Sequence, residues 1–343
     1  MNFCTSAIVC SAVLLGLAGP AVAQQSSMRS QASQKSQCFE QGYGLSPDKF
    51  PAAYNAPARL DVNNGWDIFV SGSFIYWWVG QDGMDFLGTI GSGITAEQSL
   101  FQEFKWHPGF KVSLGTNLGD SWVGDVEYTY MHTQTASANS SLKTPQSSEW
   151  RMHYDQLDAR LSRPFYQGRT LTVAPYGGVR GFWLRQTYEL DTSLEYDLAM
   201  PNPNLSFNGI AKDWAVGLLT GMETHWLLGA GFRFEGDFSA SLLYDRSTKV
   251  SIDFPESDGQ LTSFALVNRG AIRSMFGMAG GFGWGAYFDR QNYHIDLLAN
   301  YEFVLLPNRT TFKGLVNAVP FEASANTGDL YMSGLTATLR LDF

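Results

Sequence analysis

His294 and Asp296 are two positions apart in a segment whose residues alternate between apolar and polar side chains. A strand would place both on one face, and an imidazole beside a carboxylate is a pair that general acid–base catalysis uses. The pair follows directly on a predicted tight turn at residues 289–292. The histidines show neither an HExxH motif nor paired ligand spacing, so the sequence predicts no metal site; they are His107, His132, His153, His225 and His294.

A larger set of charged residues falls on the polar faces of successive alternating segments. Their chemistry is ion pairing, or the lining of an aqueous path, because Arg or Lys facing lipid at the midplane of a bilayer costs about 2 to 4 kcal/mol. Small residues on one polar face would leave room beside it: Gly277, Ala279, Gly281, Gly283 and Gly285. Of these, Gly277, Gly281 and Gly283 are predicted to line the path. The predicted charged lining consists of Lys111, Asp125, Glu127, Asp158, Arg160, Arg180, Arg233, Glu235, Asp237, Asp296, Glu302 and Arg340.

The ten C-terminal residues show most clearly that a β-strand would carry such a lining. One face of a strand over this segment would be apolar to the last residue and the other would carry hydroxyls and charges. An apolar outer row suits lipid and a polar inner row suits the interior of a membrane barrel. The outer row is Leu335, Ala337, Leu339, Leu341 and Phe343, and the inner row is Thr336, Thr338, Arg340 and Asp342.

The same alternation recurs along the chain, with connections that are in turn long and short. Short turns are predicted at 117–120, 163–169, 223–226 and 289–292, and a slip of phase is expected near Asp155. The rhythm predicts an all-β, transmembrane, antiparallel up-and-down β-barrel of about 10 strands, within a range of 8 to 12. A secreted β-sandwich is the alternative, but its outer faces should be polar.

The ends of the chain predict three parts: a signal peptide at residues 1–23, a flexible periplasmic leader at 24–63 and an outer-membrane β-barrel at 64–343. Cleavage after residue 23 would leave one cysteine, Cys38, which is free or forms an intermolecular thiol contact. The net charge of −9 argues against nucleic acid as a partner. The alternation from Leu228 to Phe254 is longer than the roughly 9 to 11 residues that a membrane strand needs. The hairpin formed by this strand and the next should therefore extend beyond the membrane and pack against the loop at 189–206.

Several segments are similar to the Legionella-type major outer membrane protein family, pore-forming barrels also found in chlamydia-like bacteria. They are residues 65–77 (GWDIFVSGSFIYW), 109–115 (GFKVSLG), 175–181 (PYGGVRG), 231–244 (GFRFEGDFSASLLY) and the terminal region from Leu330 to Phe343. The resemblance implies a bacterial outer-membrane location, a β-barrel and a passive pore. It also implies that Phe343 is the signal read by the barrel-assembly machinery.

The expected function is therefore a non-enzymatic, porin-like barrel with a narrow passive path for ions or small solutes, and without a cofactor. Barrels of about eight strands are filled by their own side chains and those of about sixteen leave a channel, so ten strands predict a narrow path. A structural or adhesive surface barrel is the first alternative. An outer-rim protease is the second, but the turn beside His294 places the pair at the periplasmic end. Expected partners are outer-membrane lipid and the barrel-assembly machinery, and homo-oligomerisation stays open.

Overall fold

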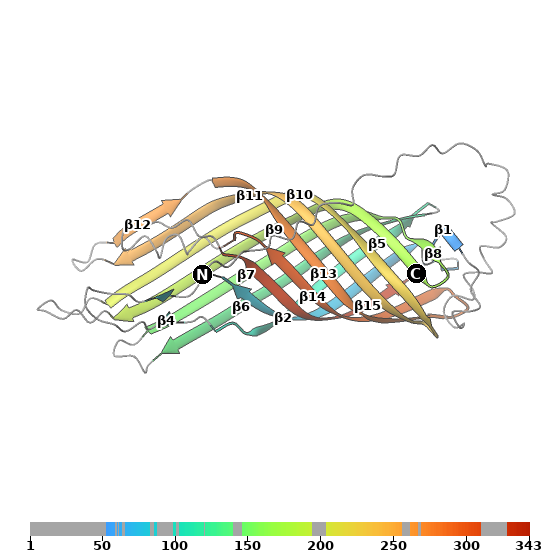
Figure 1. The fold of residues 1–343 in the computed structure, drawn as a ribbon, viewed down its shortest axis with the longest axis horizontal. Helices are drawn as coiled ribbons and strands as arrows, with labels where there is room; N and C mark the ends of the chain where they lie inside the picture. The colour runs from blue at the N-terminus through green and yellow to red at the C-terminus, as the bar shows by residue number, and fades with distance from the viewer. Residues whose placement is uncertain are drawn as a thin grey trace, which may run out of the picture. The chain divides into compact units, whose positions relative to one another are not determined.

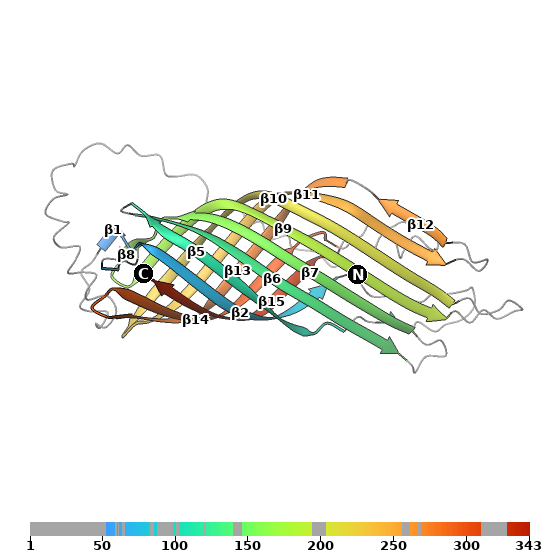
Figure 2. The same ribbon diagram turned by 180° about the vertical axis from the view of Figure 1, so that it is seen from behind.

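A computed structural model shows the protein as an antiparallel β-barrel (Figures 1 and 2). The structure describes residues 53–58, 60, 62–63, 66–82, 86–87, 99–100, 103–119, 121–139, 146–193, 204–255, 261–266, 269–309 and 328–343. The predicted signal peptide, most of the predicted leader and Cys38 lie outside these residues. No helix in the described ranges is long and apolar enough to cross a membrane.

Within these ranges, ten strands form a closed ring in which each strand pairs with its neighbours along the chain. β15 pairs with β2 and so joins the last strand to the first. The strand count and the up-and-down topology confirm the prediction. The ring consists of β2 (Ile68–Gln81), β5 (Trp106–Leu118), β6 (Trp122–Asn139), β7 (Gln146–Ser162), β9 (Leu171–Ser193), β10 (Asn204–Gly229), β11 (Phe232–Pro255), β13 (Arg269–Phe288), β14 (Tyr293–Leu306) and β15 (Leu330–Asp342).

Short strands are added at both ends of the barrel. β12 (Leu261–Leu266) pairs with β11, and β3 (Phe86–Leu87) pairs with β4 (Ser99–Leu100). β1 (Ala53–Pro57) pairs with β8 (Phe165–Gly168), which pairs with β9. Figure 1 shows β12 at one end and β1 and β8 at the other, beside the C-terminus. β1 therefore places ordered structure within a segment that the sequence predicted to be flexible.

One predicted turn was misplaced. β10 continues through residues 223–226, where Trp226 pairs with Phe234 and the two rings stack with centroids 5.4 Å apart. The reversal comes at Gly229, Ala230 and Gly231, all of which have positive φ, a conformation that glycine adopts without steric cost. Glu and His are not residue types that favour turns. The alternation of side chains within 223–226 therefore indicated a strand more reliably than the expected length of the connection indicated a turn.

The pairing also corrects two details of phase. β7 pairs with β6 from Gln146 to Ser162 without a register shift, so the predicted slip near Asp155 is wrong. Asp155 lies on the outer face, where the hydroxyl of Tyr128 donates a hydrogen bond to it at 2.5 Å. In β11, by contrast, a register shift opposite Lys212 and Asp213 interrupts the alternation that was expected to hold its phase to Phe254.

The tall hairpin is part of the barrel wall. β10 pairs with β11 as far as Asn208 and Asp253, and with β9 as far as Asn204 and Ser193. The described residues of the segment at 189–206 are the ends of β9 and β10, which pair with each other, whereas β10 pairs with β11 only from Asn208 onward. Packing of this segment against the hairpin stays a prediction, and it is the pairing with β10 that stabilises a ribbon that would be marginal alone.

The outer surface of the barrel is apolar, as the C-terminal pattern predicted. Leu218 is 71% exposed and Phe282 is 65% exposed, which is expected for side chains that face lipid. Two tryptophans face the interior: Trp77 is 2% exposed and Trp150 is 0% exposed. They belong to an apolar cluster inside the barrel that the sequence analysis did not predict.

This interior cluster occupies the half of the barrel nearer the long loops. Its members come from nine of the ten ring strands and pack into one continuous layer. They are Ile75, Trp77, Val79, Met131, Trp150, Met152, Tyr154, Phe182, Leu184, Tyr188, Leu190, Ala211, Ala215, Leu243, Met275, Leu306, Leu330 and Met332.

Candidate functional site: a charged cavity inside the barrel

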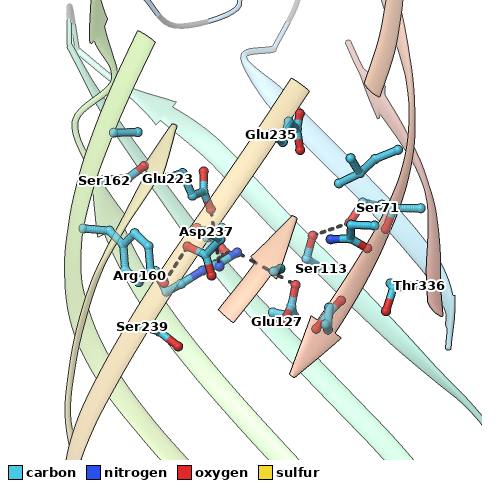
Figure 3. A pocket seen from close by; sticks show the side chains of 18 of the residues that line it. Ser71, Ser113, Glu127, Arg160, Ser162, Glu223, Glu235, Asp237, Ser239 and Thr336 are labelled. Carbon is cyan, nitrogen blue, oxygen red and sulfur yellow. Dashed lines mark hydrogen bonds and ion pairs between the residues drawn. The ribbon is translucent and has the colours of Figure 1, made fainter. Parts of the chain in front are cut away.

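A polar cavity of about 330 Å³ occupies the half of the barrel nearer the short turns. Side chains from all ten ring strands line it, because every second residue of each strand points inward. Figure 3 shows hydroxyl, carboxylate and guanidinium groups converging on this space. Outer-membrane barrels turn their short connections toward the periplasm, so the cavity lies on the periplasmic side.

The structure places nearly all of the predicted lining residues at this cavity. Those that line it are Lys111, Asp125, Glu127, Asp158, Arg160, Arg180, Arg233, Glu235, Asp237, Gly277, Gly281, Asp296, Glu302 and Arg340. The exception is Gly283. A Cβ at Gly283 would lie 2.9 Å from the guanidinium carbon of Arg233, which shows that Arg233 covers this glycine.

The inner face of β13 at these glycines is therefore partly filled by neighbouring groups, whereas the sequence predicted open space beside it. A Cβ at Gly281 would clash with the carbonyl oxygen of Ala299 on β14, and one at Gly277 would lie 2.5 Å from the hydroxyl of Ser239. These glycines allow close approach of neighbouring backbone and side chains. Gly277 and Gly281 nevertheless contribute to the cavity wall, together with Ala279.

Ion pairs hold the charged side chains in place. Arg160 donates to Asp125 at 2.7 Å between neighbouring strands, and Arg180 makes a two-point contact with Asp158 at 2.9 and 2.7 Å. Such bidentate pairs fix geometry as well as contribute energy. Arg233 donates to Asp296 at 2.6 Å from β11 to β14.

One ion pair crosses the lumen. Lys111 on β5 donates to Glu302 on β14 at 2.6 Å, and β2 and β15 lie between these two strands in the wall. This contact narrows the space that a solute could use.

Carboxylates outnumber cations around the cavity. The guanidinium group of Arg160 pairs with Asp125 and also lies 3.8 Å from a carboxylate oxygen of Glu127 and 3.7 Å from one of Glu223. Figure 3 shows Glu127 and Glu223 on either side of Arg160. Glu223 and His225 were not among the predicted lining residues because a turn was predicted at 223–226; their alternation with Thr224 was the signal for a strand. The lining contains eight carboxylates, with Glu223, against five Lys and Arg residues.

His294 and Asp296 both face inward but bind different partners. Nδ1 of His294 lies 3.1 Å from Asp342, whereas Asp296 accepts from Arg233. The structure therefore does not form the acid–base pair considered from the sequence. Among the described residues, no group of three or more His, Cys, Asp or Glu side chains is arranged to hold a metal ion.

Residues 53–58, 60, 62 and 63 lie at the periplasmic mouth of the cavity, and we call them the strap. β1 attaches it to β8, and Ala58 and Leu60 line the cavity. Asn117, near the β5–β6 turn, donates to the carbonyl oxygen of Leu60 at 3.1 Å. At its far end the backbone N–H of Asn63 donates to the carbonyl oxygen of Gln291 at 2.8 Å.

The opposite end of the cavity is closed by the apolar layer. Trp77, Tyr154 and Met275 belong both to the cavity lining and to the interior cluster, so they form its roof. Beyond them Arg309, which follows β14, reaches inward and is 2% exposed. It pairs with Asp245, lies 4.0 Å from Asp213 and stacks on the ring of Phe182.

Comparison with known proteins gives a family match over most of the chain. The sequence model described as Legionella pneumophila major outer membrane protein precursor matches residues 56–343. No curated protein matches the sequence at a significant level.

Solved outer-membrane barrels resemble the fold at low sequence identity. The outer membrane protease OmpT from Escherichia coli has 9% identity and a TM-score of 0.47, covering 83% of this chain and 98% of its own. A Pseudomonas aeruginosa FadL homologue has 9% identity and a TM-score of 0.29, covering 88% of this chain and 99% of its own. Ail of Yersinia pestis has 10% identity and a TM-score of 0.20, covering 80% and 97%.

Proposed function

Because the chain belongs to the Legionella major outer membrane protein family and is an outer-membrane β-barrel, we propose that it is a narrow, gated pore for ions or small solutes and has no enzymatic activity. The observation that carries the proposal is the charged cavity of about 330 Å³ inside the barrel. A conducting barrel needs such a space, whereas a barrel filled by its own side chains, as barrels of about eight strands are, offers no path.

In this proposal the cavity is the periplasmic vestibule of the path and the apolar layer is its gate. Hydrophobic constrictions close a pore by excluding water, and the layer from Trp77 to Met332 consists of side chains no more than 3% exposed. Opening requires movement of this layer, of Arg309 and of the strap.

The runner-up is a structural or adhesive barrel without transport. The continuous apolar layer favours it, because a permanently packed interior adds stability without conduction. The outer-rim protease is a weaker candidate, since His294 and Asp296 are engaged by Asp342 and Arg233 at the periplasmic end.

The remaining expected partners are part of the proposal. Phe343 exchanges two backbone hydrogen bonds with Ile68, at 2.9 and 3.1 Å, where the last strand meets the first. A C-terminal residue at this closing seam suits recognition by the barrel-assembly machinery before the seam forms. Oligomerisation and a thiol contact through Cys38 stay predictions.

The test is single-channel recording from the refolded full chain in a planar bilayer, with a boiled sample as the control. We expect small conductance steps with long closed periods, because the layer must open. A barrel that stays folded, as shown by heat-modifiable migration on a gel, yet never conducts at any voltage would establish the structural-barrel alternative instead.

A further inference from the structure

The outer face of the barrel carries three kinds of residue in successive rows. Aromatic rings form the first row near the long-loop end of the lipid-facing surface. Trp183 pairs in register with Trp214, and Trp214 contacts Tyr244 with ring centroids 6.1 Å apart. Such rings lie at the level of the lipid headgroups, so this row marks the outer edge of the membrane.

The second row carries two cations, Arg185 and Lys212, and we call it the cationic row. They lie in register with each other and with His153, on β9, β10 and β7, two positions closer to the long loops than Trp183, Trp214 and Asp155. All three face outward and are exposed. His132 continues the row on β6, where its ring stacks on His153 with centroids 4.0 Å apart.

Three acidic residues on the same face lie outside this row. Glu149 and Glu189 contact Arg151 at 2.7 and 3.6 Å and lie two rows further from the membrane, whereas Asp155, which accepts a hydrogen bond from Tyr128, lies in the aromatic row beside Trp183. The cationic row therefore lies between the aromatic row and the pair of Glu149 and Glu189, at the height where the phosphates of an outer-leaflet lipid would lie.

We propose that Arg185 and Lys212, flanked by His153 and supported by Trp183, form a binding site for the phosphorylated headgroup of an anionic outer-leaflet lipid. The charge supplies attraction to phosphate, and the aromatic row supplies an apolar surface for the first part of the acyl chains. A lipid held here bridges three adjacent strands, β7, β9 and β10. The site is on the outside of the barrel and is independent of the proposed pore.

The experiment measures equilibrium binding of fluorescently labelled, diphosphorylated lipid A to the refolded protein in non-ionic micelles. The test variant is the double substitution Arg185→Gln and Lys212→Gln. The matched control is Arg169→Gln and Arg290→Gln, which removes the same charge from exposed positions at the periplasmic turns. Heat-modifiable migration verifies that each variant is folded.

We expect the test variant to bind about 25-fold more weakly, because each Lys or Arg near an anionic lipid surface contributes about 1 kcal/mol, roughly fivefold. The control should bind like the parent, and binding of the parent should weaken as salt is added. Equal loss in both double variants would overturn the proposal. Equal binding of dephosphorylated lipid would overturn it too, as would complete competition by inorganic phosphate at the same concentration as unlabelled lipid A, which would indicate a simple anion site.

Discussion

Arg309 and Asp245 form an ion pair inside the barrel although 64 positions separate them in the chain. Asp245 also contacts Arg273 at 3.0 Å, and all three side chains lie at the edge of the apolar layer. Arg309 thus links the connection after β14 to Asp245 on β11 and to Asp213 on β10, and in the proposed pore it keeps this end of the interior closed.

Replacing Arg309 with Met should loosen this closure. Removal of one partner from a buried ion pair costs about 3 to 5 kcal/mol, and Asp213 would lose its contact as well. We expect more frequent opening in single-channel records and an earlier thermal transition. Arg151→Met, which removes a partly exposed arginine from the outer face, is the control and should change neither; identical behaviour of the two variants would show that Arg309 does not contribute to closure.

The strap should control the periplasmic mouth. The double variant Asn63→Ala and Asn117→Ala removes the side-chain hydrogen bonds that tie it to the β13–β14 turn and to β5. Each such bond contributes about 1 kcal/mol, so the strap should detach more often while the barrel remains folded. The expected result is higher mean conductance, with Asn208→Ala on the outer face as control. Unchanged conductance in a conducting parent would mean that the path does not pass beneath the strap.

Filling the cavity should reduce conduction. Ala279 lines the cavity and already carries a Cβ, whereas a side chain at Gly281 would meet the backbone of β14. We therefore expect Ala279→Phe to lower single-channel conductance several-fold with folding retained, and Gly281→Phe to prevent folding. Ala240→Phe, on the opposite face of the neighbouring strand β11, serves as the control. If Ala279→Phe conducts like the parent, the cavity is not part of the path.

The excess of carboxylates predicts cation selectivity. Eight carboxylates face five Lys and Arg residues around the cavity, and rings of one charge set ion preference. In a salt gradient the reversal potential should therefore indicate cation preference. Glu127→Gln with Asp237→Asn should reduce it, whereas Glu149→Gln, on the outer face, should not. Anion preference in the parent would contradict the prediction.

The sequence by itself determined the fold class and the side of the wall on which most residues lie. In a strand the side-chain period is two, so Leu339 had to face the side opposite Arg340, and repeated segments with alternating loop lengths indicated a barrel of about ten strands. For the same reason nearly all the predicted inward charges face the cavity. The prediction of a turn at 223–226 was wrong because it followed the expected length of the connection and not the alternation of the residues themselves.

Only the tertiary structure decided what the inward residues do. The period of two distinguishes inside from outside but does not encode height along the barrel axis, so it could not show that Trp77 and Trp150 lie in an apolar layer beside the long loops. Height depends on strand tilt and register, which arise when all ten strands close. Contacts such as Lys111 with Glu302 across the lumen, or Arg309 with Asp245, join residues far apart in the chain and exist only after closure, which is why neither the roof nor the strap could be predicted.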